Sequence, residues 1–138
     1  MMNIIKLLMF LLLSGSAFAQ LKKVINADEF EKAIESDTVI VLDVRKPEEY
    51  AEGYIGNAVN INWQNTDEFE TKAAELDKSK PVYVYCLAGV RSEKAADWLR
   101  KNGFNNVIGL DGGIEAWKKA GKPIKTPDSA PGKIVTIR

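Results

Sequence analysis

Apolar residues occur along this chain in short runs that alternate with amphipathic segments. Two of the runs, TVIVLDV at 38–44 and PVYVYC at 81–86, are rich in β-branched and aromatic residues. Nearly continuous apolar runs of this length, bounded by turn residues, are typical of strands buried on both faces of a sheet. They predict two central strands.

Weaker apolar runs predict three outer strands, and the segments between them have helical patterns. Helix starts are marked by Asn26 with Glu29 three residues later, by Pro47, and by Thr66 or Asp67 as an N-cap. The predicted order is strand 21–25, helix 26–35, strand 38–44, helix 47–52, strand 58–61, helix 66–76, strand 81–86, helix 91–102, strand 106–110 and helix 112–121.

Regular alternation of strands and helices predicts a parallel sheet with helices on both faces, connected by right-handed crossovers. We therefore expect a compact α/β domain over residues 20–124. After it, residues 125–138 contain Pro127 and Pro131 and have no helical period, which predicts an extended tail with an edge strand at Ile134 to Ile137.

The first residues, MMNIIKLLMFLLLSGSAFAQ, have the three parts of a secretory signal peptide: a positive charge at Lys6, an apolar core and Ala17-Phe18-Ala19 before the cut. The apolar run is shorter than the roughly 20 residues of a spanning helix. We expect cleavage after residue 19, a periplasmic or secreted mature protein, and no stable membrane association after cleavage.

Composition removes several function classes. Lys plus Arg and Asp plus Glu are 19 each, so the chain has no basic excess to attract nucleic acid. It contains no histidine, which excludes an imidazole-based metal site and a Cys/His catalytic dyad.

Cys86 is the only cysteine, and it stands where a predicted central strand ends. A lone cysteine in an exported protein indicates a reactive thiol or an intermolecular bridge, whereas an inert core cysteine is the plain alternative. Ligands bind at the carboxyl ends of parallel strands. The following turn leads into a helix near Arg91, and both the turn amides and the helix N-terminus favour an anionic sulfur. Arg91 adds a permanent cation suited to an oxyanion or sulfur anion.

Three segments carry a family resemblance: LDVRKPEEYAEGYIGNAVNI, CLAGVRS and LDGGIEAWKKAGKPI. From about Val24 to Ile124 the chain resembles a single-domain rhodanese, a sulfurtransferase. The resemblance implies a three-layer α/β/α domain with a five-stranded parallel sheet. It also implies a six-residue active loop that begins at Cys86, with Gly89 fourth and Arg91 sixth.

The resemblance implies a reaction as well. Cys86 would take the outer sulfur of thiosulfate or a persulfide and pass it to cyanide or a thiol, with no cofactor and no metal. The expected partners are a small sulfur-containing anion, a low-molecular-weight persulfide, or a protein that accepts sulfur. The terminal sulfur would be bound by Arg91 and by the amides of Leu87, Ala88, Gly89, Val90 and Ser92.

Two other functions remain open on the sequence. One is a sulfur-carrier or redox-relay module without turnover, which acts on a partner protein. The other is a phosphatase or arsenate-reductase-like enzyme, which the loop disfavours because only four residues separate Cys86 from Arg91, where tyrosine phosphatases have five. Trp63 is a candidate for the pocket rim, and the resemblance to the family implies that Asp43 and Arg45 tie loops together. Because Leu87 stands where efficient thiosulfate users often have a basic residue, we expect weak thiosulfate affinity.

Overall fold

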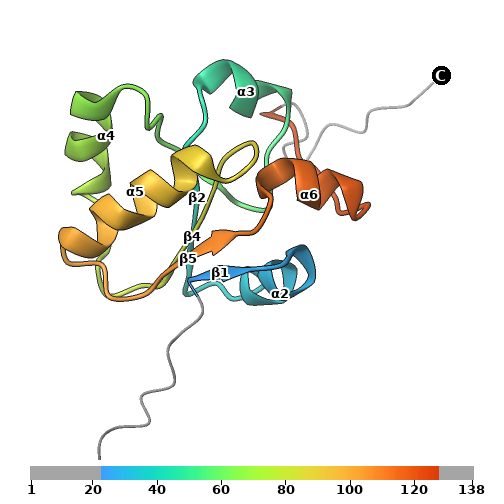
Figure 1. The fold of residues 1–138 in the computed structure, drawn as a ribbon, viewed down its shortest axis with the longest axis horizontal. Helices are drawn as coiled ribbons and strands as arrows, with labels where there is room; N and C mark the ends of the chain where they lie inside the picture. Colours follow the sequence, from blue (N-terminus) through green and yellow to red (C-terminus); the bar gives the residue numbers. More distant parts are fainter. Residues whose placement is uncertain (1–22, 128–138) are drawn as a thin grey trace, which may run out of the picture.

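The computed structural model describes residues 23–127, which form one parallel sheet covered by helices on both faces (Figure 1). The strand order is β1-β5-β4-β2-β3 and every neighbouring pair is parallel. The strands are β1 (Val24–Ile25), β2 (Ile40–Asp43), β3 (Val59–Asn60), β4 (Val82–Tyr85) and β5 (Val107–Leu110). The three-layer α/β/α architecture and the five-stranded parallel sheet are confirmed.

The helices lie where the amphipathic segments predict them. They are α2 (Ala27–Ala33), α3 (Pro47–Glu52), α4 (Thr66–Ala73), α5 (Val90–Lys101) and α6 (Gly113–Lys119). Asn26 is the N-cap of α2 and accepts from the Glu29 amide, as predicted. The prediction of Thr66 or Asp67 as the N-cap of α4 is wrong. The N-cap is Asn65, whose side chain accepts from the Glu68 amide. An Asn side chain caps a helix as well as Thr or Asp does.

The three central strands, β2, β4 and β5, contribute side chains to two cores because successive residues point to opposite faces of the sheet. Within β2, Leu42 belongs to the core beneath α4 and α5, and Val41 to the core beneath α2 and α6. Figure 1 shows these helix pairs on opposite sides of the strands. Trp117 of α6 is buried, and its Nε1–H donates to the Pro123 carbonyl at 2.9 Å.

The described chain ends beside α3. Tyr54 and Lys125 exchange two backbone hydrogen bonds of 2.8 and 2.9 Å, and the Tyr54 ring stacks on Tyr50. The predicted signal peptide and the predicted edge strand near the C-terminus lie outside the described residues. Between residues 23 and 127, no helix has the length and apolar character needed to cross a membrane.

Candidate active site

Cys86 is the first residue after β4, at the carboxyl edge of the sheet. Its exposed fraction is only 1 %, which is as low as an inert core cysteine would have. Its polar contacts are those of a binding loop, however. The Gly89 amide donates to Cys86 Sγ at 3.1 Å, and the sulfur also lies 3.3 Å from the hydroxyl of Ser92. The thiol is therefore buried but surrounded by groups that can stabilise a sulfur anion.

The loop after Cys86 turns through Gly89, the N-cap of α5, whose φ of 120° is a conformation that side chains rarely adopt. The helix begins at Val90, one residue before the predicted start. Because a helix start leaves its first amides without internal partners, backbone N–H groups of the loop and of the first turn of α5 are free to bind an anion. No hydrogen bond within residues 23–127 uses the amides of Leu87, Ala88, Val90, Arg91 and Ser92.

Helix α6 fixes the other side of this loop. The amide of Ile114 donates to the Cys86 carbonyl at 2.9 Å, and that of Glu115 donates to the Leu87 carbonyl at 3.1 Å. Gly113 permits this approach: a Cβ there would lie only 2.6 Å from the Cys86 carbonyl oxygen and still closer to that of Leu87. The amides of α6 thus bind the loop carbonyls, and the loop conformation depends on Gly113, which is not among the predicted site residues.

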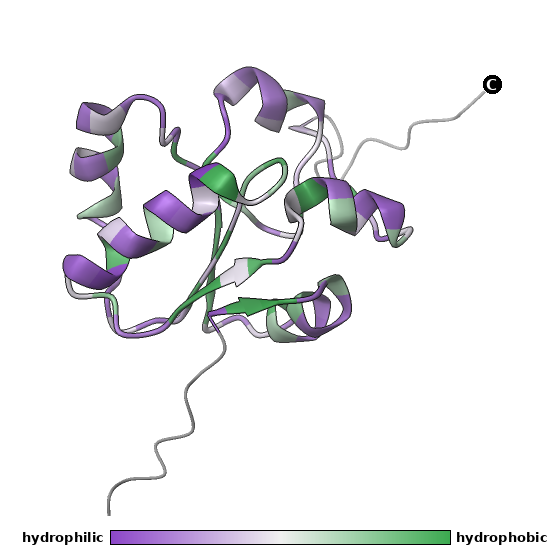
Figure 2. Cartoon of the chain, in the orientation of Figure 1, coloured by the Kyte–Doolittle hydropathy of each residue, from purple (hydrophilic) through white to green (hydrophobic). Residues whose placement is uncertain are grey.

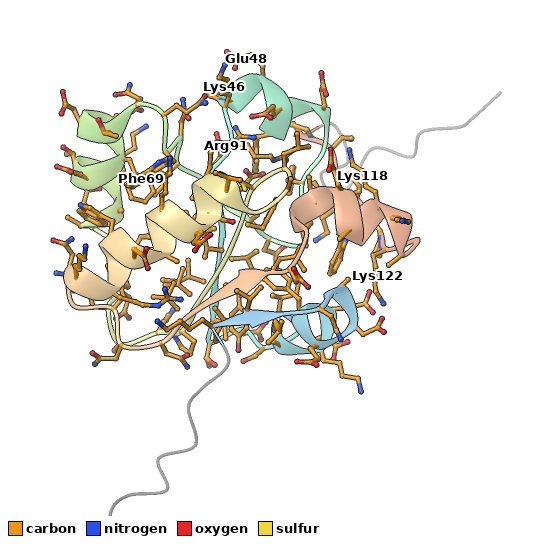
Figure 3. The ribbon with its side chains drawn as sticks, in the orientation of Figure 1. Lys46, Glu48, Phe69, Arg91, Lys118 and Lys122 are labelled. Carbon is orange, nitrogen blue, oxygen red and sulfur yellow. The ribbon has the colours of Figure 1, made fainter. Side chains whose placement is uncertain are left out.

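Arg91 is held by an acidic partner. Its guanidinium makes two hydrogen bonds to the Glu49 carboxylate, of 2.7 and 3.0 Å, and Figure 3 shows Arg91 at the first turn of α5 on the side where α3 lies. Glu49 also accepts from the Lys46 amide. The hydrogen bond from Arg91 is the main cause that lowers the pKa of Glu49 to about 2. The pKa of Arg91 is raised, chiefly by Glu49 and to a smaller extent by the nearby Cys86 and Asp43.

Asp43 and Arg45 form a buried ion pair of 2.7 Å at the end of β2. The Arg45 guanidinium also donates to the Gly53 carbonyl at 2.6 Å, which joins the end of α3 to the sheet. Burial is the largest single influence on the pKa of Arg45 and lowers it, but the hydrogen bond to Asp43 and the nearby charges, Asp43 foremost, together outweigh burial, so the pKa is raised. These contacts are the loop-tying ones that the sequence predicts.

A model of the family described as the rhodanese-like domain matches residues 26–120, which is most of the described chain. This chain belongs to the rhodanese-like domain family. Among solved structures, the rhodanese-related protein of Thermoplasma volcanium has a TM-score of 0.65 and 33 % identity, over 75 % of this chain and 97 % of that one.

Relatives with curated names include sulfurtransferases and tRNA hydroxylases. Thiosulfate sulfurtransferase GlpE of Coxiella burnetii is 40 % identical over 80 residues, which are 58 % of this chain and 72 % of that protein. The tRNA uridine(34) hydroxylase of Pelagibacter ubique is 41 % identical over 90 residues, 65 % of this chain but only 30 % of that protein. This rhodanese-like chain therefore spans less than a third of the hydroxylase's length.

The loop of this rhodanese-like domain presents apolar side chains to solvent. Leu87 is 38 % exposed and Val90 67 %, and much of the loop and the very start of α5 are green in Figure 2. Trp63 is half-buried and packs edge-to-face on Phe69, 4.9 Å between ring centroids. Its ring is thus anchored to the core beneath α4 and α5, and its place at a pocket rim stays a prediction.

A cleft of about 340 Å³ lies beside the loop, between α5 and the β1 and β5 strands. It reaches Gly89 and Ser92 at one end and Arg100 at the other, and Trp63 is not among its lining residues. Within residues 23–127 no group of His, Cys, Asp or Glu side chains is arranged to hold a metal ion.

Sequence reasoning missed three parts of this site. Glu49 and Gly113 are not among the predicted site residues, and Ser92 is predicted only as a backbone donor. The signal for Ser92 was present, because a hydroxyl in the first turn after the cysteine lies within reach of its sulfur.

Proposed function

We propose that this chain is an exported sulfurtransferase that moves sulfane sulfur from a donor, through a persulfide on Cys86, to a thiophilic acceptor. The observation that carries the proposal is the hydrogen bond from the Gly89 amide to Cys86 Sγ, next to loop amides that have no acceptor among residues 23–127. Such amides match the charge that an outer persulfide sulfur bears. The sulfurtransferase name of the GlpE relative agrees with it.

The reaction needs no proton transfer to the cysteine. The Cys86 thiolate attacks the outer sulfur of thiosulfate, the S–S bond of the donor breaks, and sulfite leaves with the electron pair. Cyanide or a thiolate then attacks the outer sulfur of the persulfide, and Cys86 leaves as a thiolate. The absence of histidine from the chain is thus compatible with both steps.

The site favours an organic persulfide over thiosulfate as the donor. Arg91, the cation of the loop, already has the Glu49 carboxylate as its partner, so a thiosulfate dianion gains little net attraction. The exposed Leu87 and Val90 side chains favour an apolar donor or acceptor surface instead. Because Cys86 is almost fully buried, only a donor whose outer sulfur stands at the end of a narrow group can reach it.

Mass spectrometry of the Cys86 peptide tests the proposal directly. After treatment with thiosulfate or a low-molecular-weight persulfide, the wild-type peptide is expected to gain one sulfur and to lose it again when cyanide is added. The Cys86→Ser variant is the matched control and gains nothing. A wild-type peptide that gains no sulfur from either donor overturns the proposal.

Turnover assays separate the three candidate functions. A sulfurtransferase forms thiocyanate repeatedly from a sulfur donor and cyanide, whereas a carrier or relay module forms at most one equivalent per protein. A phosphatase would instead hydrolyse an aryl phosphate, which the expected enzyme leaves intact. Export is tested separately: full-length protein expressed in a Gram-negative host is expected in the periplasmic extract with Gln20 as its first residue.

A further inference from the structure

Ser92 is buried in the first turn of α5, with an exposed fraction of 3 %, and its hydroxyl lies between the Cys86 sulfur and the Gly89 carbonyl. The oxygen is 3.3 Å from Cys86 Sγ and 3.1 Å from the Gly89 carbonyl oxygen. When Cys86 is a thiol, its S–H donates to Ser92, and the hydroxyl of Ser92 donates to the carbonyl of Gly89. The three groups then form a short chain of hydrogen bonds.

Ionisation of Cys86 changes which group donates. The thiolate has no hydrogen, so it is only an acceptor, and the Ser92 hydroxyl has a single hydrogen for two acceptors. A hydrogen bond to a charged acceptor is roughly twice as strong as one to a neutral carbonyl. The hydroxyl therefore rotates toward the sulfur when the sulfur is charged.

We propose that Ser92 is a catalytic residue whose hydroxyl donates to the Cys86 thiolate and returns to the Gly89 carbonyl once Cys86 is a persulfide. This inference rests on the proposed sulfur transfer. In the persulfide the charge is on the outer sulfur, and Cys86 Sγ, now bonded to two atoms, is a poor acceptor. The Ser92 hydroxyl thus donates to Sγ when Sγ is negatively charged and to the Gly89 carbonyl when it is not.

The two half-reactions then depend on Ser92 differently. In loading, the thiolate attacks the outer sulfur of the donor and loses the hydrogen bond as its charge moves outward. In unloading, cyanide attacks the outer sulfur, the Cys86 S–S bond breaks, and Sγ receives the electron pair and regains the bond. Ser92 therefore stabilises Cys86 as a leaving group, and its removal slows unloading more than loading.

Single-turnover kinetics measure this difference. Ser92→Ala is expected to slow thiocyanate release from preloaded enzyme by about 10- to 100-fold, the range for a hydrogen bond to a charged group. The rate of loading by a low-molecular-weight persulfide is expected to change less than about threefold, because a thiolate that has lost a stabilising hydrogen bond is also more nucleophilic.

A second pair of variants controls for packing. Ser92→Thr keeps the hydroxyl and Ser92→Val has the same shape without it, so both place the same extra methyl group in the site. We expect near wild-type unloading with Thr and the slow unloading of Ser92→Ala with Val. Two results overturn the role of the hydroxyl and leave the proposed sulfur transfer intact. One is equal slowing of loading and unloading in Ser92→Ala, and the other is slow unloading in both Ser92→Thr and Ser92→Val. A wild-type enzyme that takes up no sulfur overturns both.

Discussion

Arg91 and Glu49 are 42 positions apart in the chain and meet through two parallel N–H···O bonds beside the Cys86 loop. Glu49 also closes the first turn of α3 through the Lys46 amide. One carboxylate thus links the helix that follows the thiol to the helix on the far side of the site. It also determines how much positive charge the loop offers to an anionic substrate.

Replacement of Glu49 by Gln is expected to improve thiosulfate use. The amide oxygen still accepts from Lys46, but the negative charge that competes with the substrate for Arg91 is gone. A unit charge a few Å away contributes roughly 1 kcal/mol at a partly solvated site, so KM for thiosulfate should fall about three- to tenfold. Steady-state thiocyanate assays measure it, and KM for an uncharged sulfur donor serves as the control. An unchanged or higher KM for thiosulfate contradicts the prediction.

The same carboxylate contributes stability in a defined pH range. Arg91 lowers the pKa of folded Glu49 from 4.5 to about 2, so the unfolded chain binds a proton there before the folded one does. The contribution is complete above pH 4.5 and is lost as the pH falls toward 2. Urea unfolding at pH 7, 4.5 and 3 should show a steeper loss of unfolding free energy in wild type than in Glu49→Gln. If the unfolding free energies of wild type and Glu49→Gln fall in parallel with pH, the ion pair of Glu49 with Arg91 adds nothing to stability.

Most of the fold is predictable because its signals are local. The runs at 38–44 and 81–86 are apolar enough to identify β2 and β4, and Asn26 with Glu29 identifies the start of α2. The choice of Thr66 or Asp67 as a cap fails for a local reason too, since Asn65 has the same capping chemistry. Several neighbouring capping residues give the pattern no means of choosing among them.

The site is predictable only where chemistry and chain position coincide. Cys86 and Gly89 are found because the loop is continuous in sequence. The partner of Arg91 is not found, because no periodicity relates residues on α3 and α5 that meet only in the folded chain. The buried position of Ser92 likewise follows from how the first turn of α5 packs, which composition does not specify.

Leu87 offers a way to test whether charge limits the use of thiosulfate. Its side chain is 38 % exposed at the loop, so an Arg there fits without burial of its charge. Leu87→Arg adds a cation that Glu49 does not neutralise, and KM for thiosulfate is expected to fall by about tenfold or more. Leu87→Gln, which is polar and uncharged, is the control and should change KM little. The idea fails if Arg and Gln have the same effect.

Gly113 tests whether α6 sets the shape of the catalytic loop. Its φ is +61°, and a Cβ there would collide with the Leu87 carbonyl. Gly121 has a similar φ of +72° but nothing within 4 Å of its Cβ position, so Gly121→Ala is a matched control for backbone strain alone. Strain in this region costs about 1–2 kcal/mol, and a buried clash adds roughly 1–3 kcal/mol.

Gly113→Ala is therefore expected to lose more unfolding free energy than Gly121→Ala in urea titrations. Its sulfur loading should fall at least tenfold, because relief of the clash moves the Cys86 and Leu87 carbonyls off the amides of α6 and turns the loop amides away from the sulfur. Gly121→Ala should load at the wild-type rate. Equal stability of the two variants with normal loading in both would mean that the loop keeps its shape without α6.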